Sequence, residues 1–326
     1  MKKPYAYEPS LALVKEEDMT KELCEEYFNI KKSNFVFIPD KFKTEEMCIK
    51  AIVSCSSDIE KVPKSFYSQD FFNKCFKASA NTIIVMPEQY VTKEMVNTVY
   101  EHHIYLFNSI PKKYLTQDIC DKAINYSCLS ISHVPDKFKT KEMCIMAIQR
   151  NDELYIYIPD KFKTEELILQ MIDFNGGKAI KVVEKNRLTN KICIKAVEDD
   201  YQMLEEIPDE FLSYEVLYCA VKKEPFAITL IKKKYLDLKI CELAINMDAK
   251  LLYAIPDELK TIDMCKKALE CSYHNIMYVP SRLQIDEICI PVIKNKPDYI
   301  DCLYNPSKEL IKLSKEVKKR RARGEY

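Results

Sequence analysis

Apolar and polar positions recur along this chain with a period of 24 residues. Within the stretch from Ile158 to Ile172, a proline is followed five residues later by Thr164 and then by apolar residues three and four apart. A threonine at this place can accept hydrogen bonds from the free amides of a helix that starts at Glu165, and proline keeps the preceding segment extended. Apolar residues at this spacing form one face of an α-helix, so the pattern predicts a helix of about ten residues.

The same phase is kept through most of the sequence. We count twelve copies, which begin at residues 15, 39, 63, 87, 111, 135, 159, 183, 208, 232, 256 and 280. A cysteine nine residues after the proline and an alanine three residues further, as in Cys48 and Ala51, recur in many copies. Apolar pairs just before the proline, such as Tyr155 and Ile158, predict a second helix of about six residues.

These observations predict the fold class. No copy can bury its apolar faces alone, whereas stacked copies can. We therefore expect an all-α fold, an elongated αα solenoid of about twelve 24-residue helix-turn-helix repeats. A leucine-rich repeat has a similar period, but it needs an alternating strand followed by a recurring asparagine. The stretch from Met47 to Ile52 does not alternate, and no asparagine recurs in phase.

Three segments are expected: an N-terminal lead-in (1–14), the helical repeat array (15–303), and a C-terminal capping helix with a basic tail (304–326). One extra residue between Val183 and Thr189, together with the nearby Gly-Gly pair, predicts a bend near 176–189.

The last segment should begin with a capped helix. Ser307 is the predicted cap of a helix from Lys308, which would lie on the array through Leu310, Ile311 and Leu313.

The repeat pattern Ala-Val/Ile-x6-Leu-x2-Val/Ile-Pro-x2-Phe/Leu-x-Thr-x3-Cys resembles a short helical repeat family of unknown function. That family is known from giant viruses of amoebae and from host-associated bacteria. The copy from Ala147 to Thr164 is similar over its whole length, and the resemblance covers roughly residues 15 to 303. The glycine that often precedes the leucine is missing, and copies 63–86 and 183–207 are degenerate. The resemblance implies a helical repeat fold, and it brings no function with it because the family has no established activity.

The composition argues against several classes of function. The 326 residues include 50 basic and 50 acidic side chains, and this balance argues against a general binder of nucleic acid or anionic membranes. With only three glycines, a phosphate-binding loop or dinucleotide fingerprint cannot be built. The N-terminus lacks a signal peptide, and no apolar run of about 18 residues occurs. We expect a cytoplasmic protein, or a nuclear one if its basic tail is an import signal. If the protein is viral, the compartment would be that of the host cell.

The fourteen cysteines are expected to be reduced thiols in such a compartment. Those in phase, such as Cys48, Cys144 and Cys265, should be buried core residues. The exposed thiols should be among the cysteines outside this phase, which are Cys55, Cys75, Cys128, Cys219 and Cys302. No pair has the spacing of zinc ligands, so no metal site or cofactor is predicted.

Catalysis is not expected. The only histidine pair, His102-His103, falls at a helix end, where a cation complements the helix dipole. Nothing in the sequence orients a Cys–His nucleophilic pair. We predict no catalytic, cofactor-binding or metal-binding residue.

An acidic residue recurs at the second position of the predicted helices. Such carboxylates suit the positive end of a helix, although they would also form a docking edge for a basic partner. Nearby lysines are expected to neutralise them in part. The carboxylates are Glu46, Asp70, Glu94, Asp118, Glu142 and Glu166, and the lysines include Lys41, Lys43, Lys137 and Lys139.

The basic tail is the one concentrated charge run. Nuclear import and contact with a phosphate backbone are its candidate roles, and a solvated tail is the alternative. The candidate residues are Lys318, Lys319, Arg320, Arg321 and Arg323.

The sequence thus predicts a non-enzymatic protein–protein interaction scaffold that binds a protein or peptide along its repeat surface, as a monomer. The alternative is a nucleic-acid-associated or nuclear-targeted repeat protein that uses the basic C-terminal tail; no other contact with nucleic acid and none with a membrane is expected.

Overall fold

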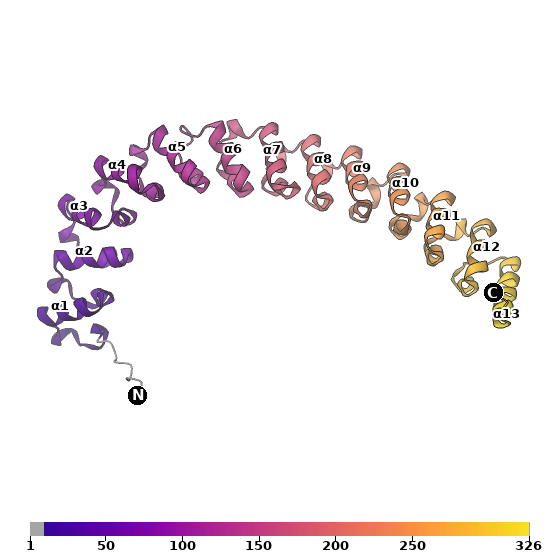
Figure 1. The fold of residues 1–326 in the computed structure, drawn as a ribbon, viewed down its shortest axis with the longest axis horizontal. Coiled ribbons are helices and arrows are strands. Elements are labelled where there is room, and N and C mark those ends of the chain that lie inside the picture. Colours follow the sequence, from indigo (N-terminus) through magenta and orange to yellow (C-terminus); the bar gives the residue numbers. More distant parts are fainter. Residues whose placement is uncertain (1–9, 326) are drawn as a thin grey trace. The chain divides into compact units, whose positions relative to one another are not determined.

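A computed structural model describes residues 10–325, and all regular secondary structure within them is helical. The chain divides into two compact units, Met1–Cys144 and Ile145–Tyr326. Within each unit, successive helices lie side by side in chain order (Figure 1). The predicted all-α repeat solenoid is confirmed.

The longer helix of each copy is an α-helix of ten residues, with the exception of α7, which has eleven. These helices are α1 (Lys21–Ile30), α2 (Glu45–Ser54), α3 (Gln69–Ala78), α4 (Lys93–His102), α5 (Gln117–Tyr126), α6 (Lys141–Arg150), α7 (Glu165–Asn175), α8 (Asn190–Asp199), α9 (Tyr214–Lys223), α10 (Leu238–Met247), α11 (Ile262–Cys271) and α12 (Asp286–Asn295).

The shorter helix is a 3₁₀-helix of five or six residues, which refines the predicted helix of about six. Turns of this tighter kind are common as short connectors. These helices are η3 (Lys32–Phe37), η5 (Ser56–Lys61), η7 (Ala80–Ile84), η9 (Ile104–Ser109), η11 (Cys128–Ser132), η12 (Asp152–Tyr157), η14 (Gly177–Val182), η16 (Tyr201–Glu205), η18 (Pro225–Leu230), η20 (Ala249–Ala254), η22 (Tyr273–Tyr278) and η24 (Pro297–Cys302).

The proline loop contains a further turn of 3₁₀-helix, which the sequence did not predict. Its first flanking residue is the proline, held extended as in Pro159 at φ −61° and ψ 145°. These turns are η4 (Asp40–Phe42), η6 (Lys64–Phe66), η8 (Glu88–Tyr90), η10 (Lys112–Tyr114), η13 (Asp160–Phe162), η15 (Lys185–Arg187), η17 (Asp209–Phe211), η19 (Lys233–Tyr235), η21 (Asp257–Leu259) and η23 (Ser281–Leu283).

The predicted helix caps are present. Thr44 Oγ1 accepts a hydrogen bond from the backbone N–H of Met47 at 3.3 Å, and Thr164 caps α7 in the same way at 3.2 Å. The apolar stripe of each α-helix, such as Met47, Cys48 and Ala51, is then buried against its neighbours. Local capping and the burial of one stripe per copy together explain the stack.

The in-phase cysteines form the centre of this core. Cys24, Cys48, Cys120, Cys144, Cys193, Cys241, Cys265 and Cys289 have no exposed surface. All cysteines are free thiols, and burial raises the pKa of Cys265 to about 11. The expected burial is confirmed.

Two other cysteines differ from expectation. Cys75, predicted to lie outside the ladder, is buried because it stands where Ala51 stands in the preceding copy. Cys271, which we did not predict to be exposed, is exposed at the end of α11 together with Cys55 and Cys302 elsewhere.

The extra residue of the array lies in α7 and not between Val183 and Thr189. Glu184, with φ −64° and ψ 138°, takes the place of the proline before η15, so the copy begins at 184. The additional residue lengthens α7, which ends at Asn175. Gly176 follows as the cap, with a positive φ of 84° that favours glycine. The bend near 176–189 stays a prediction; α7 packs against α8 across this step.

The ends of the array are covered. Residues 1–9 of the predicted lead-in lie outside the described residues. Leu11 is fully buried, and its backbone N–H donates to Asn34 Oδ1 at 3.0 Å.

At the other end, α13 (Lys308–Ala322) begins at the predicted cap, Ser307, whose Oγ accepts from the Leu310 N–H at 3.2 Å. The helix packs on α12 and η24. Its buried residues are Leu310, Ser314 and Val317, which lie one turn apart on one face. Of the predicted contacts, Leu310 is buried, Leu313 is half-buried and Ile311 is exposed. Within residues 10–325, no helix is long and apolar enough to cross a membrane.

Candidate binding groove

A groove of about 800 Å³ crosses three successive copies of the first unit. It is formed by the ends of η7, η9 and η11 and by the proline loops that follow them. Because the same edge of each copy contributes, the groove follows the repeat and is not confined to one helix pair.

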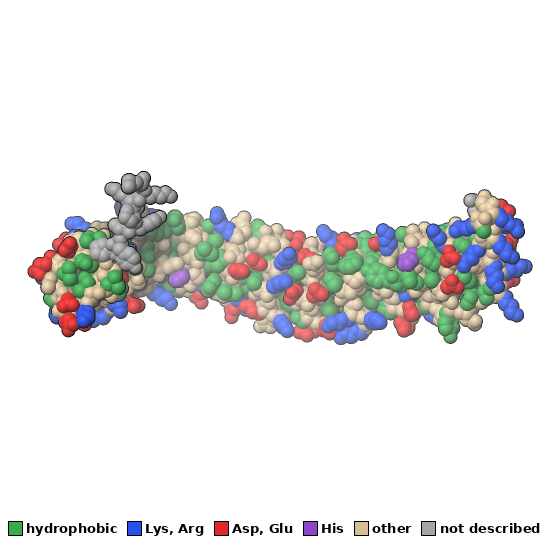
Figure 2. Space-filling model, turned by 90° about the horizontal axis from the view of Figure 1, so that it is seen from below, with side chains coloured by type: hydrophobic (Ala, Val, Ile, Leu, Met, Phe, Trp, Pro, Cys, Tyr) green, Lys and Arg blue, Asp and Glu red, His purple; other side chains and the backbone are tan. Residues whose placement is uncertain are grey.

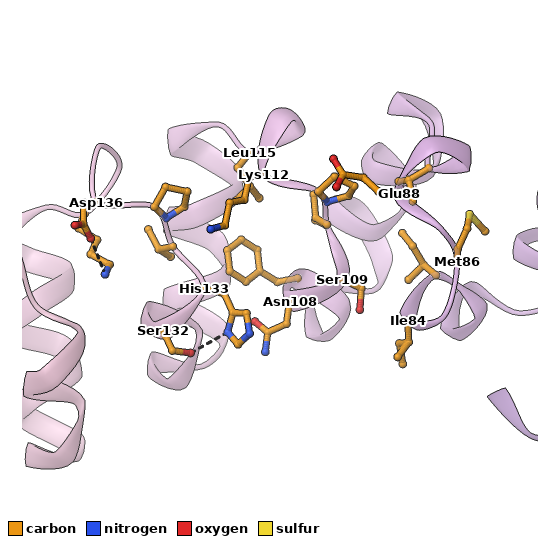
Figure 3. A pocket seen from close by; sticks show the side chains of 18 residues that line it. Ile84, Met86, Glu88, Asn108, Ser109, Lys112, Leu115, Ser132, His133 and Asp136 are labelled. Carbon is orange, nitrogen blue, oxygen red and sulfur yellow. Dashed lines mark hydrogen bonds and ion pairs between the residues drawn. The ribbon is translucent and has the colours of Figure 1, made fainter. Parts of the chain in front are cut away.

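The floor of the groove is apolar and its rim is polar. Phe107 and Ile110 are buried at its centre, and Val91 and Leu115 are buried beside them. The rim carries the exposed Ile84 and the polar or charged Glu88, Asn108, Ser109, Lys112, Ser132, His133 and Asp136. Figure 3 shows Met86, Ile84 and Glu88 at one end, Asp136 at the other, and Lys112 and Leu115 between them.

His133 on the rim contacts the neighbouring Ser132. Its Nδ1 lies 2.8 Å from the hydroxyl of Ser132, and the hydroxyl also donates to the carbonyl of Leu129 at 2.9 Å. The side chain is exposed on the groove (Figure 3). The sequence showed His133 only as an isolated histidine; its place beside a proline loop was the signal that could have found it.

Four copies bury a lysine at one repeat position, four residues after the proline. Lys43, Lys139, Lys163 and Lys260 each directly follow the proline-loop turn, and all four are buried. Lys43 Nζ binds Asp40 Oδ1 at 2.8 Å and the carbonyl of Lys61 at 2.6 Å. Lys260 Nζ binds Asp257 Oδ1 and the carbonyl of Tyr278, both at 2.8 Å.

These contacts correct one expectation from the sequence. Lys43 and Lys139 were predicted to neutralise the acidic residues at the helix starts. Instead they pair with Asp40 and Asp136 in their own proline loops, at 2.8 and 3.0 Å. An ammonium group that is buried needs such partners, because removal from water is costly.

The acidic helix starts are served by other lysines. Glu46 pairs with Lys50 at 2.5 Å, and Asp70 with Lys74 at 2.7 Å. Both pairs lie one helical turn apart and are largely exposed, so each contributes little to stability. These contacts are what the helix-start interpretation leads one to expect.

A second cavity of about 240 Å³ lies at the equivalent place in the second unit. It is lined by Asp209, Leu212, Leu230 and Lys232 among others. Asp209 binds Lys232 Nζ at 2.6 Å and Lys234 Nζ at 2.8 Å, and both lysines come from the following copy. Hydrogen bonds from these two lysines hold the pKa of Asp209 well below its ordinary value.

In the copy that begins at Glu184, Glu184 and Arg187 stand where most other copies have the proline and the aromatic residue of the loop. Lys163 is bound by Glu184, and Arg187 binds Asp160 at 3.0 Å. The buried hydroxyl of Tyr155 makes no hydrogen bond among residues 10–325. Burial and the charge of Glu184 raise the pKa of Tyr155.

Four of the five predicted tail residues lie on α13 and Arg323 follows it as the cap; four of the five have partners among residues 10–325. Lys318 binds Asp298 at 2.9 Å, and Arg321 donates to the carbonyl of Asn295 at 2.7 Å. Arg320 pairs with Glu316 at 2.6 Å and Arg323 lies 3.9 Å from Glu325. Figure 2 shows basic side chains gathered at the end of the second unit that carries α13.

Two of these contacts fasten α13 to the repeat beneath it. Asp298 and Asn295 belong to the last copy, so part of the basic run has a structural use that we did not foresee.

The histidine pair lies where it was predicted. His102 is the last residue of α4, and His103 follows it as the cap. The ring of His103 lies edge-on to Tyr105 at 5.8 Å.

Comparison with known proteins gives one match. A family model described as a domain of unknown function (DUF4116) matches residues 116–163. The matched segment, from 116 to 163 inclusive, is 48 residues long, which is twice the period of 24. The match is consistent with a helical family of unknown function. No curated protein and no solved structure matches the chain.

Proposed function

We propose that this chain is a non-enzymatic interaction scaffold that binds a segment of a partner protein in the groove of its first unit. The groove supports the proposal because it has an apolar floor, a polar rim and room for several side chains. It also extends over three copies, which is how repeat proteins present long binding surfaces.

Exposed apolar side chains near the proline loops give further support. Ile84, Ile156, Tyr253 and Met277 lie at one repeat position, three residues before the proline or its equivalent, and are 47–61% exposed. Side chains of this kind supply contact area when a partner covers them.

The alternative, nucleic-acid contact through the tail, draws less support. Most of the cations of the tail are engaged by partners within the protein. We therefore place partner binding at the groove, in a cytoplasmic protein that acts as a monomer, or in the host cell if the chain is viral.

An affinity capture with two matched variants tests the proposal. Asn108→Arg places a long cation in the groove and should abolish capture of the partner from extracts of the cells in which the protein occurs. Glu60→Arg alters the same repeat position outside the groove, with a larger change of charge, and should leave capture unchanged.

Equal capture by the wild type and Asn108→Arg would contradict the groove as the binding surface. Equal loss in both variants would show a charge effect unrelated to the groove.

A further inference from the structure

The groove exists where two copies lack the buried lysine. Val91 follows η8 just as Lys43 follows η4, and Leu115 follows η10 in the same way. In the copies with lysine, the ammonium group lies between the proline loop and the next copy. With Val91 and Leu115 in its place, no side chain from this position reaches that space.

The partners that such an ammonium would need are still present in copy 87. Glu88 is the first residue of η8, as Asp40 is of η4 and Asp257 of η21. The carbonyl of Ser109 is equivalent to those of Lys61 and Tyr278, each 18 residues beyond the lysine position. Within residues 10–325, the carbonyl of Ser109 accepts no hydrogen bond.

Glu88 itself is weakly engaged. Its carboxylate lies 4.0 Å from Lys113 Nζ, and both side chains are more than half exposed. An exposed pair at this distance contributes little, so the carboxylate is available to a second cation.

Two observations within this chain show that the carboxylate at the start of the turn pairs with lysine. Where Asp40 or Asp257 begins the turn, a lysine of the same loop fills the space. Where Leu212 leaves the space open in copy 208, Asp209 recruits Lys232 and Lys234 from another copy. In copy 87 the lysine equivalent to Lys234 is Lys113, which lies 4.0 Å from Glu88, and Val91 stands where the loop lysine stands in copy 39.

We propose that the groove receives a lysine side chain from the partner segment, with its ammonium group bound by Glu88 and the carbonyl of Ser109. Its alkyl stem lies over Ile83, Val91 and Phe107, which line the same part of the groove. The proposal deepens the scaffold function and rests on it. Charge complementarity and the lysines of the other copies identify the side chain.

One lysine is accommodated and not two. The next position along the groove has Leu115 in place of lysine, but its turn begins with Lys112 instead of a carboxylate. A second ammonium group there would face a like charge, whereas the turn at the first position begins with the carboxylate of Glu88.

Methyl NMR of the full chain tests this with defined probes. The probe is the peptide acetyl-Ser-Ile-Lys-Val-Ser-amide, and its control carries norleucine in place of lysine. The lysine peptide should shift the methyl signals of Met86 and Val91 at concentrations below about 5 mM, and the norleucine peptide should not. Glu88→Gln should weaken binding of the lysine peptide about tenfold, because the ion pair of carboxylate and ammonium becomes a hydrogen bond from the ammonium to a neutral amide.

Filling the space from within gives an independent readout. Val91→Lys should melt within about 4 °C of the wild type and should no longer respond to the lysine peptide, because its own ammonium takes the place. Leu115→Lys, at the same repeat position but beside Lys112, should melt lower. Comparable melting of the two variants would overturn the proposed role of Glu88, as would unfolding of Val91→Lys.

The remaining outcomes separate the two proposals. If the lysine and norleucine peptides bind equally, the groove is a peptide site but the lysine inference is wrong. If n-butylammonium chloride alone gives the same shifts at the same concentration, the site takes a small amine and not a protein segment. If no probe shifts Met86 or Val91, the lysine inference fails, while the Asn108→Arg capture still decides the scaffold function.

Discussion

Gly177→Ala is expected to destabilise the second unit by about 3 kcal/mol, in the upper range of overpacking substitutions. A Cβ atom at Gly177 would lie 2.4 Å from the backbone oxygen of Ala196 in α8 and 3.3 Å from Cβ of Asp200. The Gly177 N–H also donates to Asp199 Oδ2 at 2.7 Å, which holds η14 close to α8. A backbone atom cannot move aside as a side chain can, so the two elements must separate.

The measurement is the urea midpoint of unfolding, with amide exchange in α8 as the local readout. Gly324→Ala is the control for replacing a glycine where there is space: its φ is positive at 69°, but nothing lies within 4 Å of the added Cβ, and its cost should stay near 1 kcal/mol. A wild-type midpoint and unchanged exchange for Gly177→Ala would show that η14 does not approach α8 this closely.

The second large effect is expected from reversing a buried charge. Lys260→Glu should destabilise the protein by about 3–5 kcal/mol, because it leaves a buried carboxylate beside Asp257 and the carbonyl of Tyr278. All three groups would then be hydrogen-bond acceptors. Accelerated amide exchange in η22 and α11 should report the loss.

Lys260→Leu is the control for this prediction. Leucine stands at the same position in several copies, among them Leu188 and Leu212, so its volume fits. The Tyr278 carbonyl would lose a donor while apolar surface is buried, and the net cost should be about 1 kcal/mol. Equal costs for the leucine and glutamate variants would mean that the ammonium position is wetter than its burial indicates.

The fold could be predicted because each copy repeats the same local physics. The cap at Thr164 and the buried stripe around Cys48 and Ala51 depend on residues close in sequence, and their recurrence makes them visible. The phase at Glu184 was misread because Val183 was aligned with the prolines. The backbone shows instead that Glu184 takes the extended proline conformation.

The groove was not predicted because it forms where Val91 and Leu115 stand in place of the lysine that other copies bury. Lys43 and Lys139 were interpreted as surface charges beside acidic helix starts, since lysine is rarely fully buried. One signal was available: aspartate precedes these lysines by three residues in the loops of Lys43, Lys139, Lys163 and Lys260. That pairing indicates a buried ion pair, and its absence at Val91 then indicates a space.

Site-specific photo-cross-linking tests the central claim, that the groove of the first unit is the surface that binds a partner. A benzophenone amino acid is placed at position 108 on the groove rim, and in a second protein at position 60, its repeat equivalent outside the groove. We predict cross-links from position 108 to one partner segment that contains a lysine near the linked residue, and loss of these cross-links in the Val91→Lys background. Equal cross-linking of the same partner from position 60 would contradict the account. Cross-links from position 108 that persist unchanged in the Val91→Lys background would contradict it as well.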